Sequence, residues 1–163
     1  MLFRTTALQL LKETVDRRAK NSDVSDALSG WFEGRTSLDV LDLHAGTGAT
    51  LRALAPILAQ DQAWTLYARD QAEEALARDH LTRWAPAARA TEDGLLIERQ
   101  GQKIAVRFKM HDVVAAGGAL AEPPPSLVVI DEDLMRYPAA VIRKLVAILA
   151  DRRSVMHARL VYD

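Results

Sequence analysis

Four acids each stand where an apolar run of the chain gives way, and two glycines closely follow the first acid. They are Asp42, Asp70, Asp112 and Asp131, with Gly46 and Gly48. The carboxyl ends of parallel strands meet at one edge of a sheet, and ligands bind there where the strand order reverses. Carboxylates at such an edge could accept hydrogen bonds from hydroxyl groups or hold a cation. A glycine turn beside them would let a ligand approach bare backbone.

The same acids could instead cap the helices that follow them, because negative charge is favourable at a helix N-terminus. For Asp70 we favour ligand binding, whereas for Asp42 and Asp112 both roles stay open. Four acids on one edge are more than solvation requires, so the pattern favours a binding site there.

The glycines belong to a strand, a turn and a helix in succession. Residues 38–43 form an apolar run typical of a buried parallel strand, and apolar residues in 51–58 recur at helical spacing. Residues 63–68 predict the next strand, and Asp70 follows it where βαβ nucleotide folds place a ribose-binding carboxylate. Leu51 stands where the dinucleotide fingerprint requires a third glycine, so an NAD site fits poorly.

The run Val-Leu-Asp-Leu-His-Ala-Gly-Thr-Gly at 40–48, together with residues 66–76, resembles motif I and the second-strand acid of class I S-adenosylmethionine (SAM) methyltransferases. His44 departs from the glycine usual in that family, although some nucleic-acid methyltransferases carry a bulky residue there. The resemblance implies an α/β, Rossmann-like three-layer sandwich with a mostly parallel central sheet. It also implies SAM as cofactor and methyl transfer to an unidentified acceptor, with a small molecule slightly favoured over RNA or protein.

The resemblance also implies roles for individual residues. Gly46 and Gly48 would pass under the methionine part of SAM, Asp42 would help to hold its ammonium group, and Asp70 would accept the ribose hydroxyls. Asp112 and the backbone N–H of its neighbour would meet the adenine. The other implied cofactor-binding residues are His44, Ala45, Gln71, Val113 and Asp131.

Methyl transfer requires little acid–base chemistry, because the sulfonium is already activated and the enzyme mainly aligns the reactants. The candidate catalytic residues are Asp131, His44 and His111, but packing or hydrogen bonding explains each histidine better. The sequence after the fourth expected strand, 131–134, lacks the prolines and aromatic residue of the Asn/Asp-Pro-Pro-Tyr motif. An exocyclic amine acceptor is therefore disfavoured.

The composition is that of one ordinary globular domain, with 163 residues, 49% of them hydrophobic and 26% charged. We expect N-terminal helices in 1–35 and a Rossmann-like core in 36–163. A net charge of −1 does not indicate nucleic-acid binding, although a local basic patch would allow it. The chain contains no cysteine, and we expect no metal site. With no signal peptide and no apolar run near the about 20 residues of a membrane span, we expect a cytoplasmic protein.

The remaining elements follow from periodicity. We expect helices at 6–20, at 22–32, from 72 to about 84 and at 138–150, with the first two packed on the sheet or on each other rather than covering a site. A hairpin is expected from 95–98 and 103–109, the alternation in its second strand suiting a sheet edge. Trp64 and Tyr67 should lie in the core, and Arg69 should pair with Asp70. Residues 127–130 and 155–162 are expected as the fourth and fifth strands.

The chain stops after the fifth expected strand, where the sheet of the family normally continues into an antiparallel hairpin. We expect that C-terminal hairpin to be missing, either because the protein is a trimmed member of the family or because the sequence is a fragment. In both cases we expect the open edge to pair with a second copy, giving a homo-oligomer, or a rearrangement to compensate for it. The alternative function is that of a catalytically degenerate SAM-binding or scaffold protein with the same fold.

Overall fold

The computed structural model describes residues 22–58, 61–110, 125–130, 138–140, 142, 143, 147 and 155–158. Its elements are α2 (Ser22–Trp31), β1 (Ser37–Asp42), α3 (Ala49–Leu54), η1 (Ala55–Ile57), β2 (Asp61–Ala68), α4 (Gln71–Trp84), β3 (Arg89–Ala90), β4 (Gly94–Arg99), β5 (Gln102–Met110), β6 (Leu127–Ile130) and β7 (Val155–Ala158). The helix expected at 6–20 lies outside the described residues. Residues 139, 140, 142, 143 and 147 are helical, within the helix expected at 138–150.

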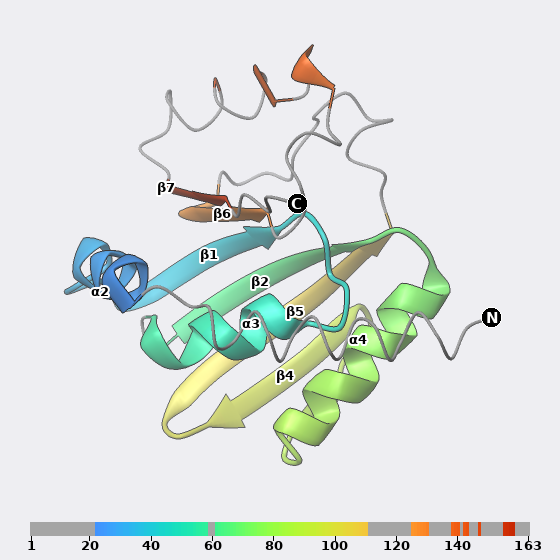
Figure 1. The fold of residues 1–163 in the computed structure, drawn as a ribbon. Helices are drawn as coiled ribbons and strands as arrows, with labels where there is room; N and C mark the ends of the chain where they lie inside the picture. The colour runs from blue at the N-terminus through green and yellow to red at the C-terminus, as the bar shows by residue number, and fades with distance from the viewer. Residues whose placement is uncertain are drawn as a thin grey trace.

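The described strands form a seven-stranded mixed sheet in the order β3-β4-β5-β2-β1-β6-β7 (Figure 1). Strands β5, β2, β1, β6 and β7 run parallel, and β4 and β3 are added antiparallel beyond β5. The chain goes from β1 to β2 and β5 on one side, then returns to β6 on the other side of β1. The strand order therefore reverses next to β1, and the expected α/β fold with a mostly parallel, Rossmann-like sheet is confirmed.

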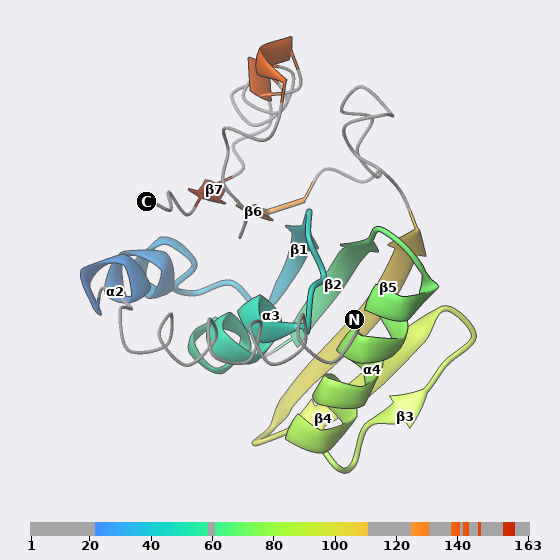
Figure 2. The same cartoon turned by 45° about the vertical axis from the view of Figure 1, so that its right-hand side comes forward.

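Helices α3 and α4 lie on the same face of the sheet (Figures 1 and 2). The hydrophobic core lies between that face and the two helices, and alternate residues of β1, β2 and β5 project into it. Trp64 is buried in this core, as expected, and so is Leu81 of α4. Tyr67 is also buried, as expected, but lies outside this core cluster. Truncating a buried leucine such as Leu81 to alanine typically costs about 2–5 kcal/mol, so α4 is firmly attached to the sheet.

The hairpin of β4 and β5 is confirmed, with Gly94 opposite Arg107 and Arg99 opposite Gln102. Its turn is made by Gln100 and Gly101, which both have positive φ, as two-residue hairpin turns require. The expectation that 103–109 lies at an edge is wrong, because β5 pairs with β2 on one side and β4 on the other. Its alternation arises instead because one face packs in the core while the other is largely exposed.

Two local sequence signals explain where helices stop. The helix expected over 51–58 is α-helical only to Leu54 and continues as the 3₁₀ turn η1, because Pro56 lacks an N–H and crowds the preceding turn. Helix α4 ends at Trp84, before Ala85 and Pro86, as predicted.

Helix α2 packs on the sheet, as favoured from the sequence. Its Leu28, and Phe32 just after it, belong to the core cluster, and Figure 1 places the helix beside the amino end of β1. It does not cover the carboxyl edge. Trp31 at its end is 64% exposed. Within the described part of the chain, no helix has the length and apolar character needed to cross a membrane.

Candidate functional site

The glycine loop, residues 43–48, connects β1 to α3 at the carboxyl end of β1, where the strand order reverses. Backbone bonds attach it to the strands on both sides of β1. The N–H of Leu43 donates to the carbonyl of Val129 in β6 at 3.1 Å, and the N–H of Ala45 donates to the carbonyl of Tyr67 in β2 at 2.8 Å. These two bonds fix the loop to the carboxyl edge of the sheet.

Asp42 is the last residue of β1 and is completely buried. Its Oδ1 accepts a hydrogen bond from the backbone N–H of His44 at 3.0 Å. One oxygen of the acid thus shapes the first turn of the loop. A buried acid beneath a backbone turn at the carboxyl edge is suited to receive a cationic group of a ligand.

The two glycines of the loop serve different purposes. Both have positive φ, +50° at Gly46 and +71° at Gly48, a conformation that costs other residues energy. A Cβ on Gly48 would lie 2.9 Å from Cγ of Leu81, so this glycine lets the loop approach α4 closely. A Cβ on Gly46 would meet only His44 within 4 Å, at 3.6 Å from Cε1, so Gly46 is the less crowded of the two.

Glu73, in the first turn of α4, is a residue of the candidate site that was not expected from the sequence. Its Oε1 accepts the N–H of Gly46 at 2.9 Å and lies 3.0 Å from Nε2 of His44. Its Oε2 accepts the N–H of Arg69 at 2.8 Å and the Nε–H of Arg69 at 3.1 Å. Both carboxylate oxygens are thus used, and they connect the glycine loop, the end of β2 and α4.

The surroundings of Glu73 hold it in the charged form. Burial by itself would raise its pKa, but the hydrogen bond from His44, the bond from the Arg69 N–H, the charge of His44 and the Arg69 side chain together outweigh that effect. The pKa of Glu73 is lowered from its ordinary value of 4.5 to about 2. A fixed negative charge therefore lies under the glycine loop at neutral pH.

Asp70 is exposed and is the N-cap of α4, where its Oδ1 accepts the N–H of Glu73 at 2.8 Å. The capping role considered for the acids is therefore realised here. Among the described residues, Asp70 has no further side-chain partner, so Oδ2 can still accept a ligand hydroxyl. Arg69 pairs with Glu73 at 3.1 Å instead of with Asp70 as expected.

Some of the other expected site residues lie at the loop or at the start of α4, and the rest lie outside the described residues. Ala45 is buried, with its N–H bonded to Tyr67, and the side chain of His44, which is 17% exposed, is engaged with Glu73. Gln71, the first residue of α4, is exposed near the loop. The residues outside the described part of the chain are His111, Asp112, Val113 and Asp131.

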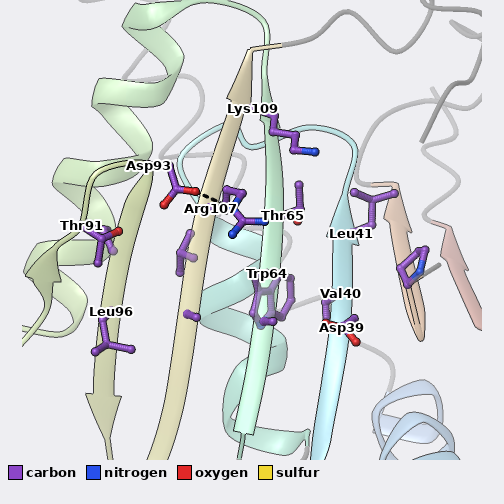
Figure 3. Close-up of a pocket in the computed structure, with 15 residues that line it drawn as sticks. Asp39, Val40, Leu41, Trp64, Thr65, Thr91, Asp93, Leu96, Arg107 and Lys109 are labelled. Atoms are coloured by element: carbon purple, nitrogen blue, oxygen red, sulfur yellow. Dashed lines mark hydrogen bonds and ion pairs between the residues drawn. The ribbon is translucent and has the colours of Figure 1, made fainter. Parts of the chain in front are cut away.

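A separate hollow of about 330 Å³ lies on the face of the sheet turned away from α3 and α4 (Figure 3). Arg107 and Asp93, paired at 2.6 Å, stand over it, with Lys109 and Thr65 close by (Figure 3). None of the expected site residues lines it. We therefore place the candidate site at the glycine loop and not in this hollow. At the loop, a turn held by backbone hydrogen bonds and fixed charges occur together.

Comparisons with known proteins support the fold. No family model and no curated protein matches the sequence. The X-ray structure of YjhP from E. coli is similar, with 13% identity and a TM-score of 0.50, covering 85% of this chain and 49% of that chain. The candidate RNA methyltransferase PH1948 from Pyrococcus horikoshii has 14% identity and a TM-score of 0.42, covering 80% of this chain and 55% of that chain.

This chain thus spans about half the length of the solved proteins it resembles. A likeness at 13% identity shows a shared fold and not a shared activity. Together with the strand order and the loop at the reversal point, it establishes a Rossmann-like α/β fold.

Proposed function

We propose that the chain binds SAM at the glycine loop and transfers its methyl group to an acceptor, with a small molecule favoured over RNA or protein. The observation that carries this proposal is the loop at the reversal point, with buried Asp42 beneath it and Glu73 held as an anion behind it. Acids are poor partners for phosphates and good partners for the ammonium and sulfonium groups of SAM. The residues present therefore fit this cofactor better than NAD.

Each residue of the site would contribute binding or alignment. Asp42 would attract the ammonium group, Gly46 would let the ligand lie against backbone, and Asp70 would accept ribose hydroxyls through the oxygen not used in capping. Bound SAM supplies the activated methyl group. The protein then has to hold the acceptor in line with it and exclude water.

The alternative is a degenerate member of the fold that binds SAM, or only a partner protein, without catalysis. The observation that favours it is the structural use already made of the site. Gly46 donates to Glu73, Gly48 packs on Leu81 and Asp70 caps α4. These interactions explain why such residues would be kept even without turnover.

The experiment is a calorimetric titration with SAM of two variants at Asp70 and one control variant. D70S keeps a side-chain oxygen for the N-cap but removes the carboxylate, whereas D70A removes both. We expect both variants to lose SAM affinity, by about tenfold for a charge-assisted bond to a ribose hydroxyl. D79S, at the exposed Asp79 of the same helix, is the matched control and should bind SAM as the wild type does.

Unchanged affinity in D70S and D70A would exclude Asp70 as a ligand. Turnover is tested separately, by incubating the wild type with methyl-labelled SAM and a cell extract. Label transferred to an extract component supports methyl transfer, whereas tight SAM binding without transfer favours the degenerate alternative.

A further inference from the structure

Five of the six backbone N–H groups of the glycine loop, residues 43–48, are already used within the chain. Loops that bind phosphates direct several backbone N–H groups at the ligand anion. Here the N–H groups of residues 43, 44, 45, 46 and 48 all donate within the chain, to Val129, Asp42, Tyr67, Glu73 and Ala45 respectively. These donors already form hydrogen bonds within the protein, and the N–H of Gly46 donates to a carboxylate.

Glu73 therefore occupies the place that a ligand anion takes in a phosphate-binding loop. Its side chain is only 6% exposed, and its carboxylate lies beside the two residues, His44 and Gly46, that form the middle of the loop. A second anion brought to the same N–H would find the donor used and a like charge behind it.

Among the described residues, one histidine and two arginines face this carboxylate or the loop. Nε2 of His44 lies 3.0 Å from Oε1, and Nε of Arg69 lies 3.1 Å from Oε2, although the Arg69 side chain is 62% exposed and so strongly screened by water. Nη1 of Arg52 donates to the carbonyl of Thr47 at 2.7 Å, on the helix side of the loop. The acidic groups beside the loop are Glu73, buried Asp42 and the exposed N-cap residue Asp70. Within the part of the chain that the structure describes, these basic groups do not outnumber the acids beside the loop.

We propose that Glu73 selects the ligand of this site by charge, favouring cationic SAM over neutral S-adenosylhomocysteine and excluding phosphate-bearing nucleotides such as NAD. This inference rests on the proposed SAM site. SAM and its demethylated product differ by one methyl group and one positive charge. A fixed anion close to the loop stabilises the first and not the second, so it favours release of the product after transfer.

The test compares the affinities of SAM and S-adenosylhomocysteine for the wild type, E73Q, E73D and E74Q, by calorimetry. In E73Q we expect the ratio of the two affinities to fall about fivefold, the size expected for one unit charge acting across a partly solvated edge. E73D keeps the charge and should keep the ratio. E74Q removes a charge one residue along the same helix, from the pair with Arg78, and should leave both affinities unchanged.

A purely structural role for Glu73 would give a different result. If Glu73 only attaches the loop to α4, E73Q weakens both ligands by the same factor, and that outcome overturns the inference while leaving the SAM site intact. If the wild type binds neither adenosyl ligand, the proposed function itself fails. Wild-type binding of NAD in preference to SAM also overturns the inference.

A measurement on the wild type covers the case in which E73Q does not fold. Raising NaCl from about 0.01 M to about 1 M shortens the Debye length from about 30 Å to about 3 Å. Selection by charge predicts that the affinity of SAM falls toward that of S-adenosylhomocysteine over this range. A ratio independent of salt would contradict it.

Discussion

The carboxylate of Glu73 should be one of the strongest local contributions to stability, and its loss should depend on pH in a specific way. E73Q keeps one carbonyl oxygen but turns an NH₂ toward one of the two sets of donors, either at Gly46 and His44 or at Arg69. Lowering the pKa of Glu73 from 4.5 to about 2, at about 1.4 kcal/mol for each unit, corresponds to roughly 3 kcal/mol. We expect E73Q to lower the free energy of unfolding by about that amount at pH 7.

The sign of the pH effect follows from the direction of the shift. The folded pKa lies below the unfolded value, so the contribution is complete above about pH 5 and is lost as pH falls through the folded value of about 2. The difference in unfolding free energy between wild type and E73Q should therefore be constant from pH 7 to about 5. It should fall to less than half by about pH 3.

Urea denaturation at each pH measures this difference, since destabilisation of other groups by acid affects both proteins alike. E74Q is the control, because the partly exposed pair of Glu74 and Arg78 is worth only about 0.3–0.5 kcal/mol. A difference in unfolding free energy between wild type and E73Q that is the same at pH 7 and pH 3 would refute this explanation.

The double variant H44A/E73Q should show a coupling free energy of about 1 kcal/mol, because His44 contributes to the lowered pKa of Glu73.

Three further predictions concern the fold and the assembly. G48A should cost about 2–5 kcal/mol in unfolding free energy, from its positive φ and the approach of its Cβ to Leu81, whereas G46A should cost about 1–2 kcal/mol from φ alone; equal costs, by urea denaturation, would contradict the difference in crowding. Q62L should cost about 2–4 kcal/mol in the same assay, because Gln62 accepts the indole N–H of buried Trp64 at 2.8 Å and donates to the carbonyl of Ala55 in η1 at 2.9 Å; a cost below about 0.5 kcal/mol would show that water replaces these bonds. We also propose that the chain is a homo-oligomer, and light scattering that finds a monomer at high micromolar concentration would count against it.

The order of elements could be predicted from the sequence because it depends on local periodicity and on a few breakers. The apolar run before Asp42, the helix ending before Ala85 and Pro86, and the hairpin around Gly101 all express such signals. The placement of β5 could not be predicted, because alternation of apolar and charged residues reports that one face is buried. It does not report how many strands lie beside it.

The role of Glu73 depends on tertiary proximity that no local pattern encodes. The bond from Gly46 joins residues 27 apart in sequence. They meet because β1 and β2 are parallel neighbours, so the glycine loop after β1 and the first turn of α4 after β2 lie at the same edge of the sheet. One signal was present. Asp70 and Glu73 stand at the N-cap and third helical positions, the spacing of a capping box, although Glu73 reaches beyond the cap to Arg69 and Gly46.

The most direct test of the account is calorimetric titration of the wild-type chain with SAM, with NAD as the matched anionic control. We expect saturable micromolar binding of SAM at one site per chain and no heat from NAD. Binding of NAD without binding of SAM would contradict both the cofactor assignment and the charge selection assigned to Glu73, and the absence of both would mean that the fold is kept for a purpose other than SAM chemistry.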